Sequence, residues 1–114
     1  MTRCIEVTVT APKEVAQRLA RIVVEESLVA CAQLSGPVAS TYRWQGELET
    51  ADEWYCRLKT TERRLPALVA RIRGLHPYEV PEIIATPIVD GNPDYLAWIE
   101  AEVNGGAKEG EAGT

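Results

Sequence analysis

The segment IEVTVTAPKEVAQRLARIVVEES (residues 5–27) decides how the chain begins to fold. Residues 5–9 alternate apolar and polar side chains, which is the period of a half-buried strand. Pro12 suits the first turn of a helix, where its missing N–H leaves no hydrogen bond unmade. From Val15 the apolar residues recur three and four apart, so this segment predicts a strand followed by an amphipathic helix that ends near Ser27.

The same two periods continue to the C-terminal part of the chain, with Gly and Pro marking the boundaries. Gly36-Pro37 breaks or bends the second strand, and Gln45-Gly46 is a plausible hairpin turn. After the first strand and helix, the expected elements are strand 29–34 with its continuation 38–45, strand 53–59, helix 61–75, strand 81–89 and helix 93–103.

The expected order is strand, helix, strand, strand, helix, strand, helix. Its first six elements match the ferredoxin-like split βαββαβ unit of the α+β class, an antiparallel sheet with two helices on one face. The C-terminal helix is an addition to that unit. The length of 114 residues and mass of 12.6 kDa favour one domain over residues 1–103. Residues 104–114 are glycine-rich without large apolar side chains, and we expect a disordered tail there.

The predicted hairpin over residues 38–60 is long, because a mean strand has only about 5–6 residues. It carries Tyr42, Trp44, Trp54 and Tyr55. These rings either pack on one another within one chain or dock on a neighbouring subunit. We favour docking, because a long aromatic strand pair with free edges promotes association.

Composition excludes several classes of protein. The formal net charge of −5 argues against a nucleic-acid partner, because nucleic acid is itself negatively charged. No apolar stretch approaches the roughly 18 residues of a membrane-spanning helix, and no signal-peptide pattern opens the chain. Three widely spaced cysteines without a C-x-x-C pair argue against a disulfide framework and a cysteine zinc site, and favour a reducing cytoplasm.

Six strings in order along the chain resemble the CutA family, the divalent-cation tolerance proteins. The resemblance covers roughly residues 5–103 and implies a ferredoxin-like subunit in a compact homotrimer, with the long hairpin wrapping a neighbour. It also implies a link to copper and other divalent cations. The strings are TAP (10–12), LVACAQ (28–33), YRWQG (42–46), LKTT (58–61), HPYEVPEI (76–83) and GNPDYLAW (91–98).

His76 and Cys31 are the candidate metal ligands, since imidazole and thiolate both suit copper. Family members credited with copper binding carry a cysteine at the position of Val9 and a second histidine at that of Leu75, so only His76 matches. The alternative for His76 is a helix-end histidine that bonds the last carbonyls of its own helix. The alternative for Cys31 is a small buried hydrophobe, and Cys4 and Cys56 are expected to be packing residues.

A second candidate site comprises Arg43, Trp44, Lys59, Tyr78 and Glu79, polar and aromatic residues within the family strings. If the hairpin reaches a neighbour, these residues converge in a cleft between subunits that can hold a small ligand. Alternatively, Lys59 and Glu79 form a structural ion pair that fixes the trimer.

The acids near the hairpin turn, Glu47, Glu49, Asp52 and Glu53, are expected to be a solvated rim, with loose attraction of hard cations as the alternative. The chain lacks an evident nucleophile–base set and a Gly-rich phosphate loop. We therefore expect a non-enzymatic protein. The cysteines favour the cytoplasm, and the resemblance to the CutA family implies a homotrimer for divalent-cation tolerance, with weak or indirect metal binding. The alternative is a sensor like the trimeric PII proteins, which binds a small anion or metabolite between subunits.

Overall fold

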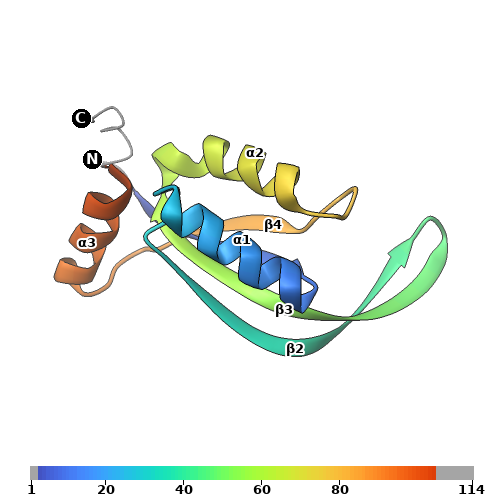
Figure 1. The fold of residues 1–114 in the computed structure, drawn as a ribbon. Helices are drawn as coiled ribbons and strands as arrows, with labels where there is room; N and C mark the ends of the chain where they lie inside the picture. The colour runs from blue at the N-terminus through green and yellow to red at the C-terminus, as the bar shows by residue number, and fades with distance from the viewer. Residues whose placement is uncertain (1–2, 105–114) are drawn as a thin grey trace.

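The computed structural model describes residues 3–104 as one two-layer unit of sheet and helices (Figure 1). The element order matches the predicted one, with a short 3₁₀ turn added before the second helix. The elements are β1 (Cys4–Ala11), α1 (Lys13–Glu25), β2 (Cys31–Trp44), β3 (Glu47–Thr61), η1 (Glu62–Arg64), α2 (Leu65–Leu75), β4 (Ile83–Pro87) and α3 (Pro93–Asn104).

The four strands form one antiparallel sheet in the order β2-β3-β1-β4. This order confirms the predicted split βαββαβ topology, in which the first and third strands are central. Helices α1 and α2 lie side by side over one face of the sheet (Figure 1). Within residues 3–104, no helix has the length and apolar character needed to cross a lipid bilayer.

The main core lies between that sheet face and the two helices. The odd-numbered positions of β1 point into it, as the alternation predicts, and Val7 and Val9 are fully buried. On the helix side, Leu19 of α1 and Ile72 of α2 pack against these strand residues. Each such side chain contributes about 1.5–3 kcal/mol when it is removed from water.

Helix α3 packs against a smaller cluster at one end of the molecule. Cys4 of β1 alternates with Ile5 and so belongs to the opposite face of the sheet, where it joins Ile99 and Val103 of α3. Helix α3 therefore covers only part of this second face, and most of the face carries polar side chains.

Several predicted boundaries were wrong by a few residues. Pro12 is the N-cap of α1 rather than part of its first turn. Strand β2 runs through Gly36-Pro37 with a register shift between Ser35 and Val38, so the pair bends the strand without ending it. Strand β3 continues to Thr61, which places the start of α2 at Leu65.

Strands β2 and β3 begin at Cys31 and Glu47, whereas the predicted starts were 29 and 53, and further differences concern the last strand and helix. Strand β4 covers only Ile83–Pro87 of the predicted 81–89, and its position at the sheet edge tolerates Pro87. Helix α3 begins at Pro93, and the Asn92 side chain accepts a hydrogen bond from the Asp94 N–H at 3.0 Å, as expected for a cap. The helix includes Asn104, so the rest of the predicted tail, residues 105–114, lies outside the described residues.

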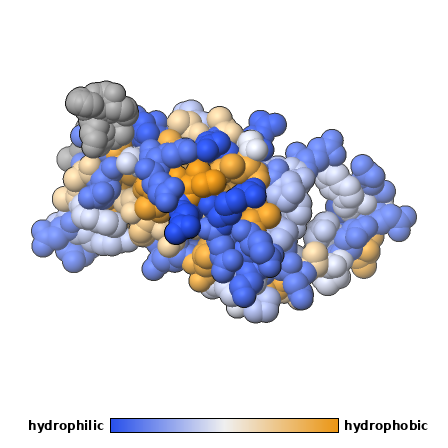
Figure 2. Space-filling model, in the orientation of Figure 1, coloured by the Kyte–Doolittle hydropathy of each residue, from blue (hydrophilic) through white to orange (hydrophobic). Residues whose placement is uncertain are grey.

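The β2–β3 hairpin projects beyond the two-layer body, as predicted from its length (Figure 1). Gln45 and Gly46 adopt φ angles of 51° and 83°, the positive values that a tight two-residue hairpin turn needs. Figure 2 shows hydrophilic residues over most of the hairpin, whereas apolar residues gather between α1 and α2.

The four hairpin aromatics do not form ring pairs with one another within residues 3–104. Trp54 instead packs against Gly36 and lies under the Lys13 ammonium, whose nitrogen is 5.4 Å from the ring centroid. Tyr42 and Trp44 remain about two-fifths exposed. The alternative in which the rings pack on one another is therefore wrong, and docking on a neighbour, which we favoured, stays a prediction.

Candidate functional site

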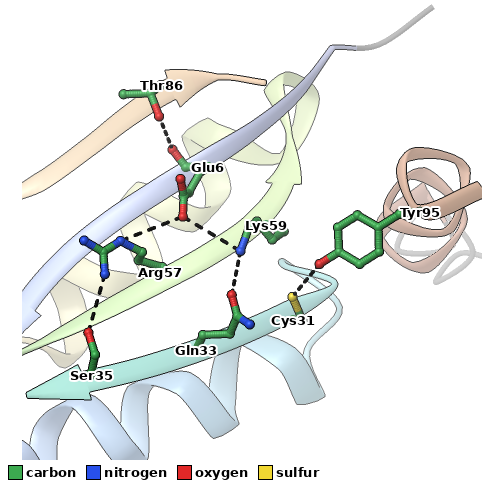
Figure 3. A network of polar contacts seen from close by, with 8 residues as sticks. All are labelled: Glu6, Cys31, Gln33, Ser35, Arg57, Lys59, Thr86 and Tyr95. Carbon is green, nitrogen blue, oxygen red and sulfur yellow. Dashed lines mark hydrogen bonds and ion pairs between the residues drawn. The ribbon is translucent and has the colours of Figure 1, made fainter. Parts of the chain in front are cut away.

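Polar side chains on the sheet face opposite α1 and α2 form a connected set, the sheet-face network (Figure 3). Glu6 of β1 faces two cations of β3, with its Oε2 3.8 Å from Lys59 Nζ and 4.0 Å from Arg57 Nε. Lys59 also donates to Gln33 Oε1 at 2.8 Å. The network comprises Glu6, Gln33, Ser35, Arg57, Lys59 and Thr86, and its charges are paired within one chain.

Cys31 lies at the end of this face, where β2 approaches α3 (Figure 3). Its Sγ is 3.4 Å from the Tyr95 hydroxyl. That contact, followed by burial, raises the pKa of Tyr95 to about 12. Cys31 is partly exposed, so the alternative of a buried hydrophobe was wrong. Cys4 and Cys56 are buried packing residues as predicted, and burial raises the pKa of the Cys56 thiol to about 12.

A second polar cluster, the loop site, forms where the loop 76–82 crosses the end of β1. It comprises Thr10, Glu53, His76, Tyr78 and Glu82. His76 is buried, and its Nε2 lies 2.8 Å from the carbonyl oxygen of Thr10, to which it donates. Its Nδ1 accepts the backbone N–H of Tyr78 at 3.2 Å. Both ring nitrogens are therefore engaged by the protein backbone.

These bonds revise the structural alternative for His76. The ring bonds a carbonyl of β1, not the last carbonyls of α2, so that part of the expectation was wrong. A metal ion at either nitrogen would have to displace one of the two hydrogen bonds. Within residues 3–104, no three His, Cys, Asp or Glu side chains come together in a way that could hold a metal ion.

Tyr78 connects the loop to the hairpin. Its hydroxyl donates to Glu53 Oε2 at 2.8 Å. Burial raises the pKa of Tyr78 to about 12, and the hydrogen bond and negative charge of Glu53 add to the shift. Tyr78 therefore keeps its proton at neutral pH and remains a donor. Next to it, Thr10 Oγ1 donates to Glu82 Oε1 at 3.3 Å.

Glu53 is the acid that sequence reasoning misplaced. It is only 5% exposed, whereas the expectation put it with Glu47, Glu49 and Asp52 on a solvated rim. The other three acids are exposed as predicted. Alternation along β3 gives no sign of this burial, because the residue that covers Glu53 is Tyr78, 25 positions away.

One chain does not bring all five predicted cleft residues together. Lys59 belongs to the sheet-face network, whereas Tyr78 contacts Glu53, six residues back along β3 and so about 20 Å away. Arg43 and Trp44 lie at the hairpin tip, and Glu79 is exposed on the loop. Lys59 pairs with Glu6 within the chain, so a pair between Lys59 and Glu79 of another copy stays a prediction.

The fold is a small α+β domain with ferredoxin-like topology, and comparison with known proteins identifies its family. Residues 5–102 match the family described as "CutA1 divalent ion tolerance protein". The chain belongs to this family, which confirms the resemblance seen in the sequence.

Relatives and solved structures agree with this assignment. The "Divalent-cation tolerance protein CutA" of Thermus thermophilus is 46% identical over 94 residues, 82% of this chain and 91% of the relative. "Protein CutA" of Mus musculus is 42% identical over 105 residues, 91% of this chain but 59% of the mouse protein. The crystal structure of CutA from Xylella fastidiosa superposes with a TM-score of 0.86 at 37% identity, covering 89% of this chain and 98% of that one.

Proposed function

We propose that this protein is a non-enzymatic, cytoplasmic homotrimer that gives tolerance to copper or another divalent cation by weak or indirect metal binding. The observation that carries the proposal is the family match over residues 5–102, together with relatives named for divalent-cation tolerance. The three separate free thiols support a reducing compartment.

Weak or indirect binding follows from the donor atoms of one chain. Tight binding of a transition metal normally needs three or four protein ligands. His76 has both ring nitrogens in hydrogen bonds, and the Cys31 thiol contacts Tyr95. A metal ion that reached either residue would gain one ligand and lose one of these contacts.

Assembly is proposed from the exposed hairpin and the sheet edge. Strand β2 is an edge strand of 14 residues, and a long edge presents unpaired backbone groups to another chain. Tyr42, Trp44 and Leu48 add exposed apolar surface to the same hairpin. A second copy that covers this surface would bury both features at once.

The second candidate function is a PII-like sensor whose intersubunit cleft binds a small anion or metabolite through Arg43, Trp44, Lys59, Tyr78 and Glu79. The observation in its favour is the Lys59 ammonium, which Gln33 and Glu6 hold in one position on the sheet face opposite α1 and α2. An anion could bind there only if a neighbouring copy left this face accessible.

A growth experiment tests the main proposal. Bacteria that lack their own gene of this family should regain growth in copper(II) when they express this chain, and not when they carry the empty vector. Failure of the expressed, folded protein to restore growth would contradict the proposal.

Calorimetry with copper(II) and zinc(II) then addresses His76. Wild type and His76→Ala should bind both ions weakly and to the same extent, if the account of the ring nitrogens is right. A large loss of binding in His76→Ala would instead make His76 a metal ligand.

A further inference from the structure

Among residues 3–104, Glu53 is the one acid that is buried, and it lacks a cationic partner in its own chain. It is 5% exposed, and no Lys or Arg nitrogen within residues 3–104 lies within 4.0 Å of its carboxylate. Its Oε2 accepts one hydrogen bond from Tyr78, whereas Oε1 makes none within this range and still touches solvent. A buried carboxylate normally has a cation or several donors.

Other carboxylates of the chain show the contrast. Glu26 is far more exposed, yet it forms two hydrogen bonds of 2.8 and 2.9 Å with Arg71. Glu6 faces both Lys59 and Arg57. Glu53 is therefore more buried than these two carboxylates, yet its own chain gives it no cationic partner.

The surroundings of Glu53 favour a cation as well. The outer part of the hairpin (residues 38–54) and the loop (residues 76–82) together carry six acids against one base, Arg43, a formal charge of −5. The inner part of the hairpin adds Arg57 and Lys59, but both face Glu6. Such a field raises the local concentration of cations. The acids are Glu47, Glu49, Asp52, Glu53, Glu79 and Glu82.

An aromatic residue contacts the carboxylate. The Tyr78 hydroxyl donates to Glu53, and the Tyr78 ring packs against the His76 ring with centroids 4.6 Å apart. Aromatic faces attract ammonium and guanidinium groups. A hard divalent ion would need six to eight oxygen ligands, and the described residues bring no three potential ligands together.

We propose that Glu53, held in place by Tyr78, binds an organic nitrogen cation, an ammonium or a guanidinium group. Its free Oε1 accepts the N–H of that cation, and the Tyr78 ring lies beside it. The group belongs either to a small molecule or to a basic side chain of a second copy. This goes beyond cation tolerance and does not depend on it, because binding is measurable without any divalent metal.

The test uses agmatine, which carries both kinds of cation, and two variants with the same change of charge. Glu53→Gln removes the buried charge and keeps the acceptor for Tyr78. Glu49→Gln is the control, because Glu49 is exposed on the same strand. Calorimetry at about 0.15 M salt screens the exposed acids. Sedimentation of all three proteins measures self-association.

Two results support the proposal and identify the source of the cation. If the cation is a small molecule, Glu53→Gln weakens agmatine binding about tenfold or more and leaves sedimentation unchanged. If it comes from a second copy, wild type does not bind agmatine, and Glu53→Gln instead weakens self-association about tenfold. Glu49→Gln behaves like wild type in both cases. Equal behaviour of the two variants overturns the proposal.

A measurement on wild type covers the case in which Glu53→Gln does not fold. The carboxyl carbon of Glu53 should change its NMR chemical shift when agmatine is added or when the protein is diluted. A constant shift under both conditions also overturns the proposal.

Discussion

The sheet-face network and the loop site use charge in opposite ways. In the network, Glu6 sits between Lys59 and Arg57, so one chain supplies both signs. In the loop site, Glu53 is more deeply buried and has one neutral donor, Tyr78. The network is complete in a single chain, whereas the loop site leaves a charge for something else to neutralise. Burial alone therefore does not show which polar cluster is structural.

The largest expected effect comes from breaking the loop site at its buried ring. His76→Ala leaves the Thr10 carbonyl and the Tyr78 N–H without their partners and creates a cavity, so the free energy of unfolding should fall by about 2–4 kcal/mol. Urea unfolding at one fixed protein concentration measures it.

A matched change in the network provides the control for His76→Ala. Gln33→Ala removes the exposed acceptor of Lys59 and should lower the free energy of unfolding by no more than about 1 kcal/mol. Equal losses for the two variants would mean that the buried His76 contributes no more to stability than the exposed Gln33.

The next effect concerns the strand that presents Glu53. A Cβ at Gly36 would lie 2.6 Å from the Trp54 ring, next to Glu53. Gly36→Ala should therefore destabilise the protein by about 1–3 kcal/mol through overpacking. Gly74→Ala is the control, because a Cβ there meets nothing within 4 Å and should stabilise α2 by about 0.5–1 kcal/mol. Thermal unfolding measures both effects: the midpoint temperature should fall in Gly36→Ala and rise in Gly74→Ala.

A smaller effect distinguishes the paired from the unpaired carboxylate. Glu6→Gln leaves Lys59, whose side chain is only 16% exposed, without its countercharge, and should destabilise the fold by about 1 kcal/mol. Glu53→Gln removes a charge that has no countercharge in its own chain, so stability should stay the same or rise if self-association is unchanged, and should fall together with self-association if a second copy supplies the cation. Chemical denaturation of the two variants at one fixed protein concentration measures the difference. A larger loss for Glu53→Gln without weaker self-association would contradict the comparison.

The smallest effect is a dependence on pH. The folded protein raises the pKa of Tyr78 to about 12, above the ordinary tyrosine value of about 10. The unfolded chain therefore loses the Tyr78 proton first, and stability should fall as pH rises from about 10 to about 12. Tyr78→Phe should show a shallower fall. Tyr95→Phe is the comparison, because Tyr95 is shifted by Cys31 and not by Glu53. Ultraviolet difference spectra follow both titrations.

Much of the fold could be predicted from local patterns. The alternation in residues 5–9, the helical spacing from Val15 and the Gln45-Gly46 turn each specify a structure through neighbouring residues alone. Boundaries were less certain because they depend on packing. The 3₁₀ turn at Glu62–Arg64, for example, delays the start of α2.

The partners of the site residues could not be predicted in this way. His76 bonds Thr10 across 66 positions, and Glu53 bonds Tyr78 across 25. Alternation places Glu6 and Lys59 on one face, but only the register of β1 against β3 sets them opposite each other. Such contacts depend on how the strands and the loop meet, which no local pattern encodes.

The central claim is that the single chain is incomplete and functions as three copies. Sedimentation equilibrium of the wild-type protein at micromolar concentration tests it most directly. The account predicts one species of about 38 kDa, three times the 12.6 kDa of one chain. A stable, folded particle of 12.6 kDa at that concentration would contradict it.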